Sequence, residues 1–176
     1  LKVGTFMEIQ TKISIETAEM FEELKSYYTE TMGMNLSKSD VLFKAISDAK
    51  DTWKEIDWQY VNEKKINIKK YEIATGSLRP KLQVTFETEE KLNELKRILP
   101  QILNVRNVTL GVCIKFILKF ALLNRELQNG KETTIKHIIE DKQKKYFTEL
   151  NSEETKLAID KFVIDILNER SEEHTS

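Results

Sequence analysis

An internal repeat constrains the fold of this chain more than any other feature of its sequence. Residues 12–25 read KISIETAEMFEELK, and 71 positions later residues 83–96 read QVTFETEEKLNELK, with six of the fourteen positions identical. In each copy an alternation of apolar and polar residues changes, at Thr17 or Thr88, to the apolar spacing of a helix. The repeat predicts one structural unit used twice, in which a short strand leads into a helix.

Each predicted strand has one apolar and one polar face. The first strand is expected over residues 8–15, and its apolar face carries Ile9, Thr11, Ile13 and Ile15. The second strand begins at Lys81, and its apolar face carries Leu82, Val84 and Phe86. We expect the apolar faces to pack on a core and the polar faces to remain exposed. Thr17 is the expected N-cap of the first helix, which ends at Gly33.

A second helix follows the first in each copy. Ser37 is the expected N-cap of a helix whose apolar stripe covers residues 41–49 and continues through Trp53 and Tyr60 to about residue 62. In the second copy, the helix from about Glu89 is expected to bend or end near Pro100. Thr109 then caps a helix that is apolar on nearly every side, VCIKFILKFALL. Such a helix is expected to be buried at the centre of the molecule, against residues 41–49.

These patterns divide the chain into four segments. The first repeat covers residues 8–63, a lysine-rich connector with turn-forming residues covers 64–80, and the second repeat covers 81–126. Residues 131–170 predict two further helices that repeat nothing earlier in the chain. The expected fold class is mainly α with a short β-ribbon, a duplicated core and a C-terminal helical extension.

Composition excludes several classes of protein. The net charge of −1 gives no overall attraction to nucleic acid or to anionic membranes, and no run of about 18 apolar residues predicts a membrane span. The single cysteine, Cys113, excludes an internal disulfide and favours a reducing, cytoplasmic compartment. The sequence shows no Gly-rich phosphate loop, catalytic triad or metal-ligand spacing. We therefore expect no enzyme, no cofactor and no metal site.

Strand, helix, turn and capped second helix, present twice, resemble the ribbon-helix-helix family of DNA-binding proteins, the Arc/MetJ/CopG group. The segments that carry the resemblance are TKISIE, Gly33 and LSKSD in the first copy, and KLQVTFE and VTLGV in the second. Together they span about residues 8–50 and 80–124. Two features depart from the family pattern. The turn MGMN before Leu36 is longer, and Gly111 with bulky apolar neighbours stands where the first copy has Ser39 and Asp40.

The resemblance implies a two-stranded ribbon in the major groove of double-stranded DNA, which is wide enough to admit it. It also implies that the N-terminus of each second helix points at a phosphate. The implied base-contacting residues are Gln10, Lys12, Ser14, Lys81, Gln83 and Thr85. The implied phosphate-contacting residues are Ser37, Lys38, Ser39, Thr109, Leu110 and Gly111.

The leading hypothesis is sequence-specific binding of double-stranded DNA, as a transcriptional repressor or as an accessory factor of a plasmid, phage or conjugative element. The extension at 131–170 is expected to supply self-association or a protein partner. An alternative hypothesis is a protein-interaction module, such as an antitoxin or a phage-encoded inhibitor, that acts through those C-terminal helices. A third is a structural helical protein whose repeat is only architectural, because a half-buried strand shows the same alternation without contacting DNA.

Overall fold

The computed structural model of the protein describes residues 6–149 and 153–173. The chain divides into two compact units, residues 1–124 and residues 125–176. The first unit therefore contains both copies of the repeat and the connector between them. Within the described ranges, no helix combines the length and the apolar content that a membrane span requires.

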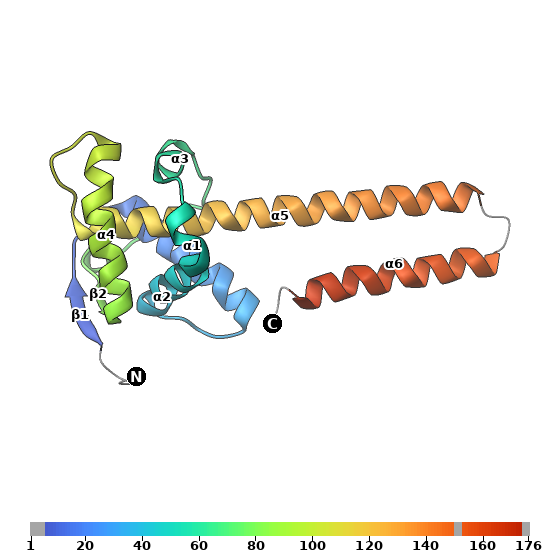
Figure 1. Cartoon of the computed structure of the whole chain (residues 1–176). Helices are drawn as coiled ribbons and strands as arrows, with labels where there is room; N and C mark the ends of the chain where they lie inside the picture. Colours follow the sequence, from blue (N-terminus) through green and yellow to red (C-terminus); the bar gives the residue numbers. More distant parts are fainter. Residues whose placement is uncertain (1–5, 150–152, 174–176) are drawn as a thin grey trace. The chain divides into compact units, whose positions relative to one another are not determined.

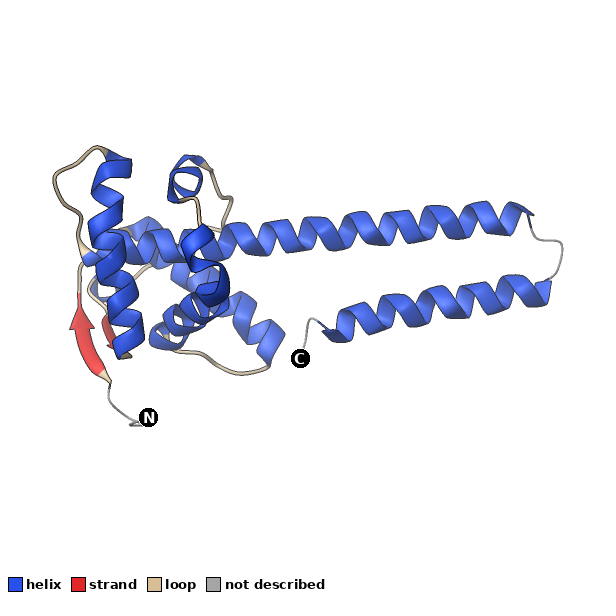
Figure 2. Cartoon of the chain, in the orientation of Figure 1, coloured by secondary structure: helices blue, strands red, loops and turns tan. Residues whose placement is uncertain are grey.

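The protein is mainly helical, with one antiparallel sheet of two strands, as the sequence predicts (Figures 1 and 2). In chain order the elements are β1 (Met7–Gln10), α1 (Ile15–Met32), α2 (Lys38–Ala49), the 3-10 helix η1 (Lys50–Glu55), α3 (Trp58–Glu63), the 3-10 helix η2 (Thr75–Leu78), β2 (Lys81–Val84), α4 (Phe86–Leu103), α5 (Leu110–Glu149) and α6 (Glu153–Glu173). Helix α5 begins in the first unit, and its residues from 125 onward belong to the second.

Helices α1 and α4 follow the two strands and have the same length, 18 residues each. Each ends on a residue in the left-handed conformation, Gly33 with φ 67° and Asn104 with φ 53°. Pro100 lies inside the last turn of α4, which ends three residues later at Leu103. The sequence therefore predicted the end of α1 at Gly33, since glycine adopts this conformation readily, and it predicted the end of α4 to within a few residues from Pro100.

The sequence prediction was wrong about the continuation of α2. A continuous apolar stripe suggested one helix to about residue 62, but α2 ends at Ala49 and the chain forms η1 and then α3. Asp57 starts the new helix, because its side chain accepts a hydrogen bond from the Tyr60 N–H at 3.1 Å. Trp53 and Trp58 then pack edge to face, with ring centroids 5.4 Å apart. The stripe predicted the burial of the apolar residues of α2 and of Trp53, but Tyr60 is exposed and the stripe did not indicate the break in the helix.

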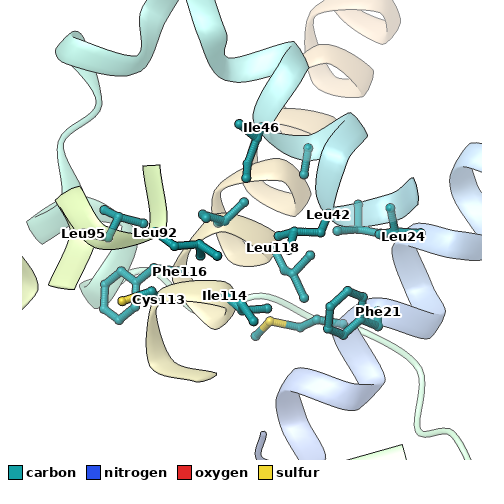
Figure 3. Packing of buried hydrophobic residues seen from close by; sticks show 14 of the residues in the cluster. Phe21, Leu24, Leu42, Ile46, Leu92, Leu95, Cys113, Ile114, Phe116 and Leu118 are labelled. Atoms are coloured by element: carbon teal, nitrogen blue, oxygen red, sulfur yellow. The ribbon is translucent and has the colours of Figure 1, made fainter. Parts of the chain in front are cut away.

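One hydrophobic cluster fills the first unit, and it includes buried side chains of α1, α2, β2, α4 and α5 (Figure 3). The apolar segment of α5 is buried, as predicted, through Cys113, Ile114, Phe116, Ile117, Leu118, Leu122 and Leu123. Its expected counterparts in α2, Val41, Leu42, Ala45, Ile46 and Ala49, belong to the same cluster. Burial of these side chains is the main favourable term that holds the strands and helices in one unit.

The connector, residues 64–80, packs against the helices of the first unit and is not a free linker. The Tyr71 hydroxyl donates to the Glu23 carboxylate at 2.5 Å, and the Tyr71 N–H donates to Glu19 at 3.4 Å, so the connector is fixed to α1. Ile66, Ile68, Ile73 and Leu78 are half-buried against the core. The sequence prediction overlooked these half-buried residues, because they are separated by polar and charged residues in a lysine-rich segment.

Lys119 attaches α3 to α5. Its ammonium group donates to the Asn62 carbonyl oxygen at 3.0 Å. Partial burial lowers the pKa of Lys119, and the nearby charge of Lys115 adds to the effect. The hydrogen bond therefore compensates for part of the lost hydration of a charged group.

In the second unit, residues 125–149 of α5 and helix α6 form an antiparallel hairpin (Figure 1). The Gln143 side-chain amide donates to the Asp160 carboxylate across the hairpin. Of the described side chains in α6, only Val163 is buried. The side chain of Tyr146, an apolar position of the first predicted C-terminal helix, lies outside the described residues, as do residues 150–152.

Candidate nucleic-acid interface

The ribbon presents one polar and one apolar face. In the antiparallel register, Glu8 lies opposite Gln83 and Gln10 lies opposite Lys81. These four side chains are exposed, whereas Leu82 and Val84 are buried and Ile9 is half-buried. The Gln83 side-chain amide donates to the Glu8 carboxylate at 3.1 Å. The strands therefore hold Gln10, Lys81 and Gln83 on one surface, as the sequence predicted for these three residues.

The pairing continues beyond the regular strands. The same register sets Ile13 opposite Leu78, and the Ile13 N–H donates to the Leu78 carbonyl oxygen at 2.9 Å. Pro80 lies between Leu78 and β2, and it interrupts the regular ladder because it has no N–H to donate. Continuation of the register places the exposed residues Lys12 and Arg79 opposite each other. The polar face thus carries three cross-strand pairs, which are Glu8 with Gln83, Gln10 with Lys81, and Lys12 with Arg79.

Two predicted base-contacting residues are helix caps. The Ser14 hydroxyl accepts a hydrogen bond from the Thr17 N–H at 3.1 Å, and the Thr85 hydroxyl accepts one from the Thr88 N–H at 3.2 Å. The helices therefore begin three residues earlier than predicted, and Thr17 and Thr88 are buried residues of the first turn. The first strand is correspondingly shorter than the predicted range of 8–15.

The early helix start also reverses the orientation of two predicted core residues. Ile15 and Phe86 are the first residues of α1 and α4, and 58% and 67% of their surface is exposed. The predicted alternation would have buried both side chains. It fails there because the backbone has left the extended conformation at the cap, so the two-residue period no longer applies.

A carboxylate occupies the N-terminus of α2. Ser37 and Asp40 form a capping box, in which the Ser37 hydroxyl accepts from the Asp40 N–H at 3.2 Å and the Ser37 N–H donates to Asp40 at 2.8 Å. The predicted cap is therefore confirmed. Asp40 places a negative charge where a phosphate would approach Ser37 and the half-buried Lys38.

Ser39 connects α2 to the opposite strand. Its hydroxyl accepts a hydrogen bond from the Gln83 N–H at 2.9 Å. The hydroxyl is thus used to hold β2 against α2, which also contacts β2 and α4 through other residues. Ser39 was predicted to contact a phosphate through the N-terminus of its helix, and the structure gives its hydroxyl this internal partner.

The N-terminus of α5 contacts the other strand in a corresponding way. Thr109 caps the helix, with its hydroxyl accepting from the Val112 N–H at 3.4 Å, and Leu110 is half-buried. Gly111 is buried against the carbonyl group of Lys12. Each second helix therefore meets the strand that belongs to the other copy.

Two ion pairs flank the ribbon. Lys115 of α5 contacts Glu16 at the start of α1 at 2.8 Å, and Lys50 contacts Glu87 at the start of α4 at 3.5 Å. Glu16 and Glu87 are equivalent positions of the repeat. Each lysine offsets the negative charge of its carboxylate. The two ion pairs therefore reduce the repulsion between these acidic helix N-termini and a polyanion near the ribbon.

Sequence reasoning missed Arg79 as a member of the polar face, whereas the alternation of the first strand placed Glu8 there without assigning it a base contact. The signal for Arg79 was present in the alternation, since Arg79 lies two residues before Lys81. Pro80 obscured it, because a proline ordinarily marks the end of a strand.

The described residues contain no group of three or more His, Cys, Asp and Glu side chains arranged to hold a metal ion. Cys113 is buried within the core, and burial raises the pKa of its thiol to about 11 although nearby Lys96 opposes the shift. The thiol is therefore protonated at neutral pH and is a poor nucleophile.

Comparison of the chain with protein-family models, curated protein sequences and solved structures gives no match. The function of the protein is therefore inferred from the sequence repeat and from the geometry of the ribbon.

Proposed function

We propose that the first unit is a tandem ribbon-helix-helix core that binds double-stranded DNA through the polar face of its ribbon. The observation that carries the proposal is the pairing of Gln10 with Lys81. These residues are 71 positions apart, which is the spacing of the repeat. When two equivalent strands pair in antiparallel fashion, a twofold axis relates them. A residue then lies opposite the equivalent residue of the other strand only where this axis passes through the ribbon. This pairing supports the proposal, because it is the register expected of a ribbon formed by two equivalent strands of one polypeptide.

The surrounding helices support the same proposal. Helices α1 and α4 begin 71 residues apart, and α2 and α5 begin 72 residues apart. The contacts of α2 and α5 are related by the same twofold rotation. Ser39 of α2 contacts Gln83 of β2, and Gly111 of α5 contacts Lys12, which follows β1. Ser39 and Gly111 are 72 positions apart, and Lys12 and Gln83 are 71 apart. Both halves therefore use equivalent residues for equivalent contacts.

The polar face has the chemistry for reading bases. A two-stranded ribbon fits the major groove, where lysine and arginine donate to guanine and glutamine pairs with adenine through two hydrogen bonds. Gln10, Lys12, Lys81 and Gln83 supply such groups on one exposed face. Ser14 and Thr85 are assigned to helix capping and not to base contact.

The charge of the chain sets the expected affinity. A net charge of −1 implies few phosphate contacts for each chain, so affinity for one site is expected to be modest. Binding as a repressor or as an accessory factor of a plasmid, phage or conjugative element would then need several adjacent sites or self-association. The cytoplasm is the expected compartment for either role.

The experiment is selection of bound duplexes from a random pool, with the Lys12→Ala/Lys81→Ala variant beside the wild type. The control variant is Lys142→Ala/Lys144→Ala, which removes the same charge from exposed positions of the second unit. We expect wild type and control to enrich the same short motif and the ribbon variant to lose it. Weak binding of all three proteins without any enriched motif would refute base reading by the ribbon.

A second candidate function, protein interaction through residues 131–170, is favoured by the apolar surface of the hairpin. Leu157 and Ile164 are exposed, and because they are two helical turns apart they share one face of α6. We propose a second copy of the chain as the occupant. Residues 135–145 carry four lysines and two acids, whereas α6 carries seven acids and three basic residues. A basic helix of one copy can thus face the acidic helix of another.

Sedimentation of the full chain tests this second candidate. We expect a dimer for the wild type and a weakened dimer for Ile164→Lys, because the substitution places a charge on the face that Leu157 and Ile164 share. Ala158→Lys adds the same side chain at an exposed position of α6 that lies about 100° around the helix from Leu157, and it should leave the dimer unchanged. A monomeric wild type at micromolar concentration would exclude self-association through this face.

A further inference from the structure

The rotation that relates the two halves of the ribbon exchanges residues of different charge. With the axis at the Gln10–Lys81 pair, Glu8 exchanges with Arg79, and Lys12 exchanges with Gln83. One end of the polar face therefore carries the pair Lys12 and Arg79, and the other end carries the pair Glu8 and Gln83. The backbone is close to symmetric, but the chemistry of its two ends is different.

The end with Lys12 and Arg79 carries only hydrogen-bond donors. Both side chains are exposed, and both are positively charged. In the major groove, guanine offers two acceptors, O6 and N7, whereas thymine offers one acceptor beside an apolar methyl group, so guanine is the better match for two charged donors. This end of the ribbon matches guanine.

The other end carries acceptors. Glu8 is acceptor-only when ionised, and it receives one hydrogen bond from the Gln83 amide at 3.1 Å. That bond orients the amide of Gln83, whose oxygen still accepts and whose second N–H still donates. The base edges that offer amino donors in the major groove are adenine, through N6, and cytosine, through N4. This end of the ribbon matches adenine or cytosine and repels the acceptor edge of guanine.

We propose that the ribbon reads a non-palindromic DNA site, with guanine at the end contacted by Lys12 and Arg79 and amino-bearing adenine or cytosine at the end contacted by Glu8 and Gln83. The inference rests on the proposed DNA-binding function, and it adds a direction to the bound site. A palindrome presents the same base to both ends, so one end would always meet an edge that does not match it. A single chain consequently binds DNA in one orientation.

The test uses the full chain and three duplexes derived from the enriched motif: the motif itself, a palindrome built from its guanine half twice, and a palindrome built from its other half twice. We expect the wild type to bind the motif about 5- to 150-fold more tightly than either palindrome, which corresponds to one or more lost base contacts. Lys12→Ala/Arg79→Ala should lose discrimination only at the guanine end.

A variant with two like ends provides the decisive comparison. Glu8→Arg/Gln83→Lys gives the second end the residue types of the first, so it should prefer the palindrome of two guanine halves over the motif. The matched control is Glu126→Arg/Gln128→Lys, which changes the charge equally at exposed positions of the second unit and should keep the wild-type preference. Circular dichroism of each variant establishes that the helices are retained.

The outcomes separate this inference from the proposed function. Failure of the wild type to enrich any motif would refute DNA reading, and the inference with it. Enrichment of a perfect palindrome, or an unchanged preference in Glu8→Arg/Gln83→Lys, would overturn the directional site while leaving sequence-specific DNA binding intact.

Discussion

The carbonyl oxygen of Lys12 and the α-carbon of Gly111 are in such close contact that a Cβ atom at position 111 would lie 2.2 Å from the oxygen. This contact joins the start of α5 to the strand of the other copy. It also explains why the second copy departs from the first at this position, where the first has Ser39. At Ser39 the side chain is accommodated, and its hydroxyl accepts a hydrogen bond from the Gln83 N–H. At Gly111 the carbonyl group of Lys12 occupies the place that a side chain would need.

Gly111→Ala is expected to lower the free energy of unfolding by about 1–3 kcal/mol, because the clash is with backbone atoms that cannot rotate away. Urea denaturation measures the change. Gly130→Ala is the matched control, since it lies in the same helix with nothing within 4 Å of the added Cβ. The control should gain up to about 1 kcal/mol from improved helix propensity. Equal stability of the Gly111→Ala variant and wild type would contradict the close contact.

Ser14→Ala and Thr85→Ala are each expected to cost about 0.5–2 kcal/mol of stability, because each removes the acceptor for an N–H of the first helical turn. Ser14→Asn should retain most of the stability, because asparagine caps helices as well as serine does. Thermal unfolding of the three variants provides the measurement. A Ser14→Ala variant of unchanged stability and altered base preference would favour the base-contacting role instead.

Asp40→Asn is expected to strengthen DNA binding about 2- to 5-fold at low salt, since it removes a negative charge from the N-terminus of α2. Fluorescence anisotropy with a labelled duplex measures the affinity. Asp48→Asn removes the same charge from the exposed outer part of α2, where Asp48 pairs with Lys44 at 2.8 Å, and should have a smaller effect. Equal effects of the two substitutions would indicate that only net charge matters and that no phosphate approaches Ser37.

Ionisation of Cys113 is expected to lower the free energy of unfolding at alkaline pH. Burial raises the pKa of its thiol in the folded state from 9.0 to about 11, so the folded protein holds this proton more strongly than the unfolded chain does. The resulting stabilisation is complete below about pH 9 and is lost as the pH rises through about 11. The wild type should therefore lose on the order of 2 kcal/mol more than Cys113→Ala between these pH values in urea denaturation. Parallel pH curves for the two proteins would contradict this.

Local sequence signals predicted some helix termini and misplaced others. Gly33 as the end of α1 and Ser37 as the cap of α2 were identified from residue type, because each acts through its own backbone or side chain. The starts of α1 and α4 were misplaced by three residues, since Ser14 and Thr17 are both acceptable caps by composition. Only the hydrogen bond from the Thr17 N–H to Ser14 distinguishes them.

The candidate interface was predicted in part. Gln10, Lys12, Lys81 and Gln83 followed from alternation and are exposed beside one another on the ribbon. Arg79 did not follow, because assigning it to this face requires the pairing register across Pro80. The internal bond of Ser39 and the carboxylate at Ser37 also depend on neighbours that alternation does not reveal.

The sequence by itself determined that this chain repeats a strand and a helix, which residues of α2 and α5 are buried, that Gly33 ends α1, and that Ser37 caps α2. These properties depend on residue type and short spacing, which a linear sequence contains. The tertiary structure alone decided that Gln10 faces Lys81, that Lys12 joins Arg79 at one end of the polar face, and that Gly111 must lack a side chain. Each of these is a contact between residues about 70 or more positions apart, and it depends on the register and packing that the whole core imposes.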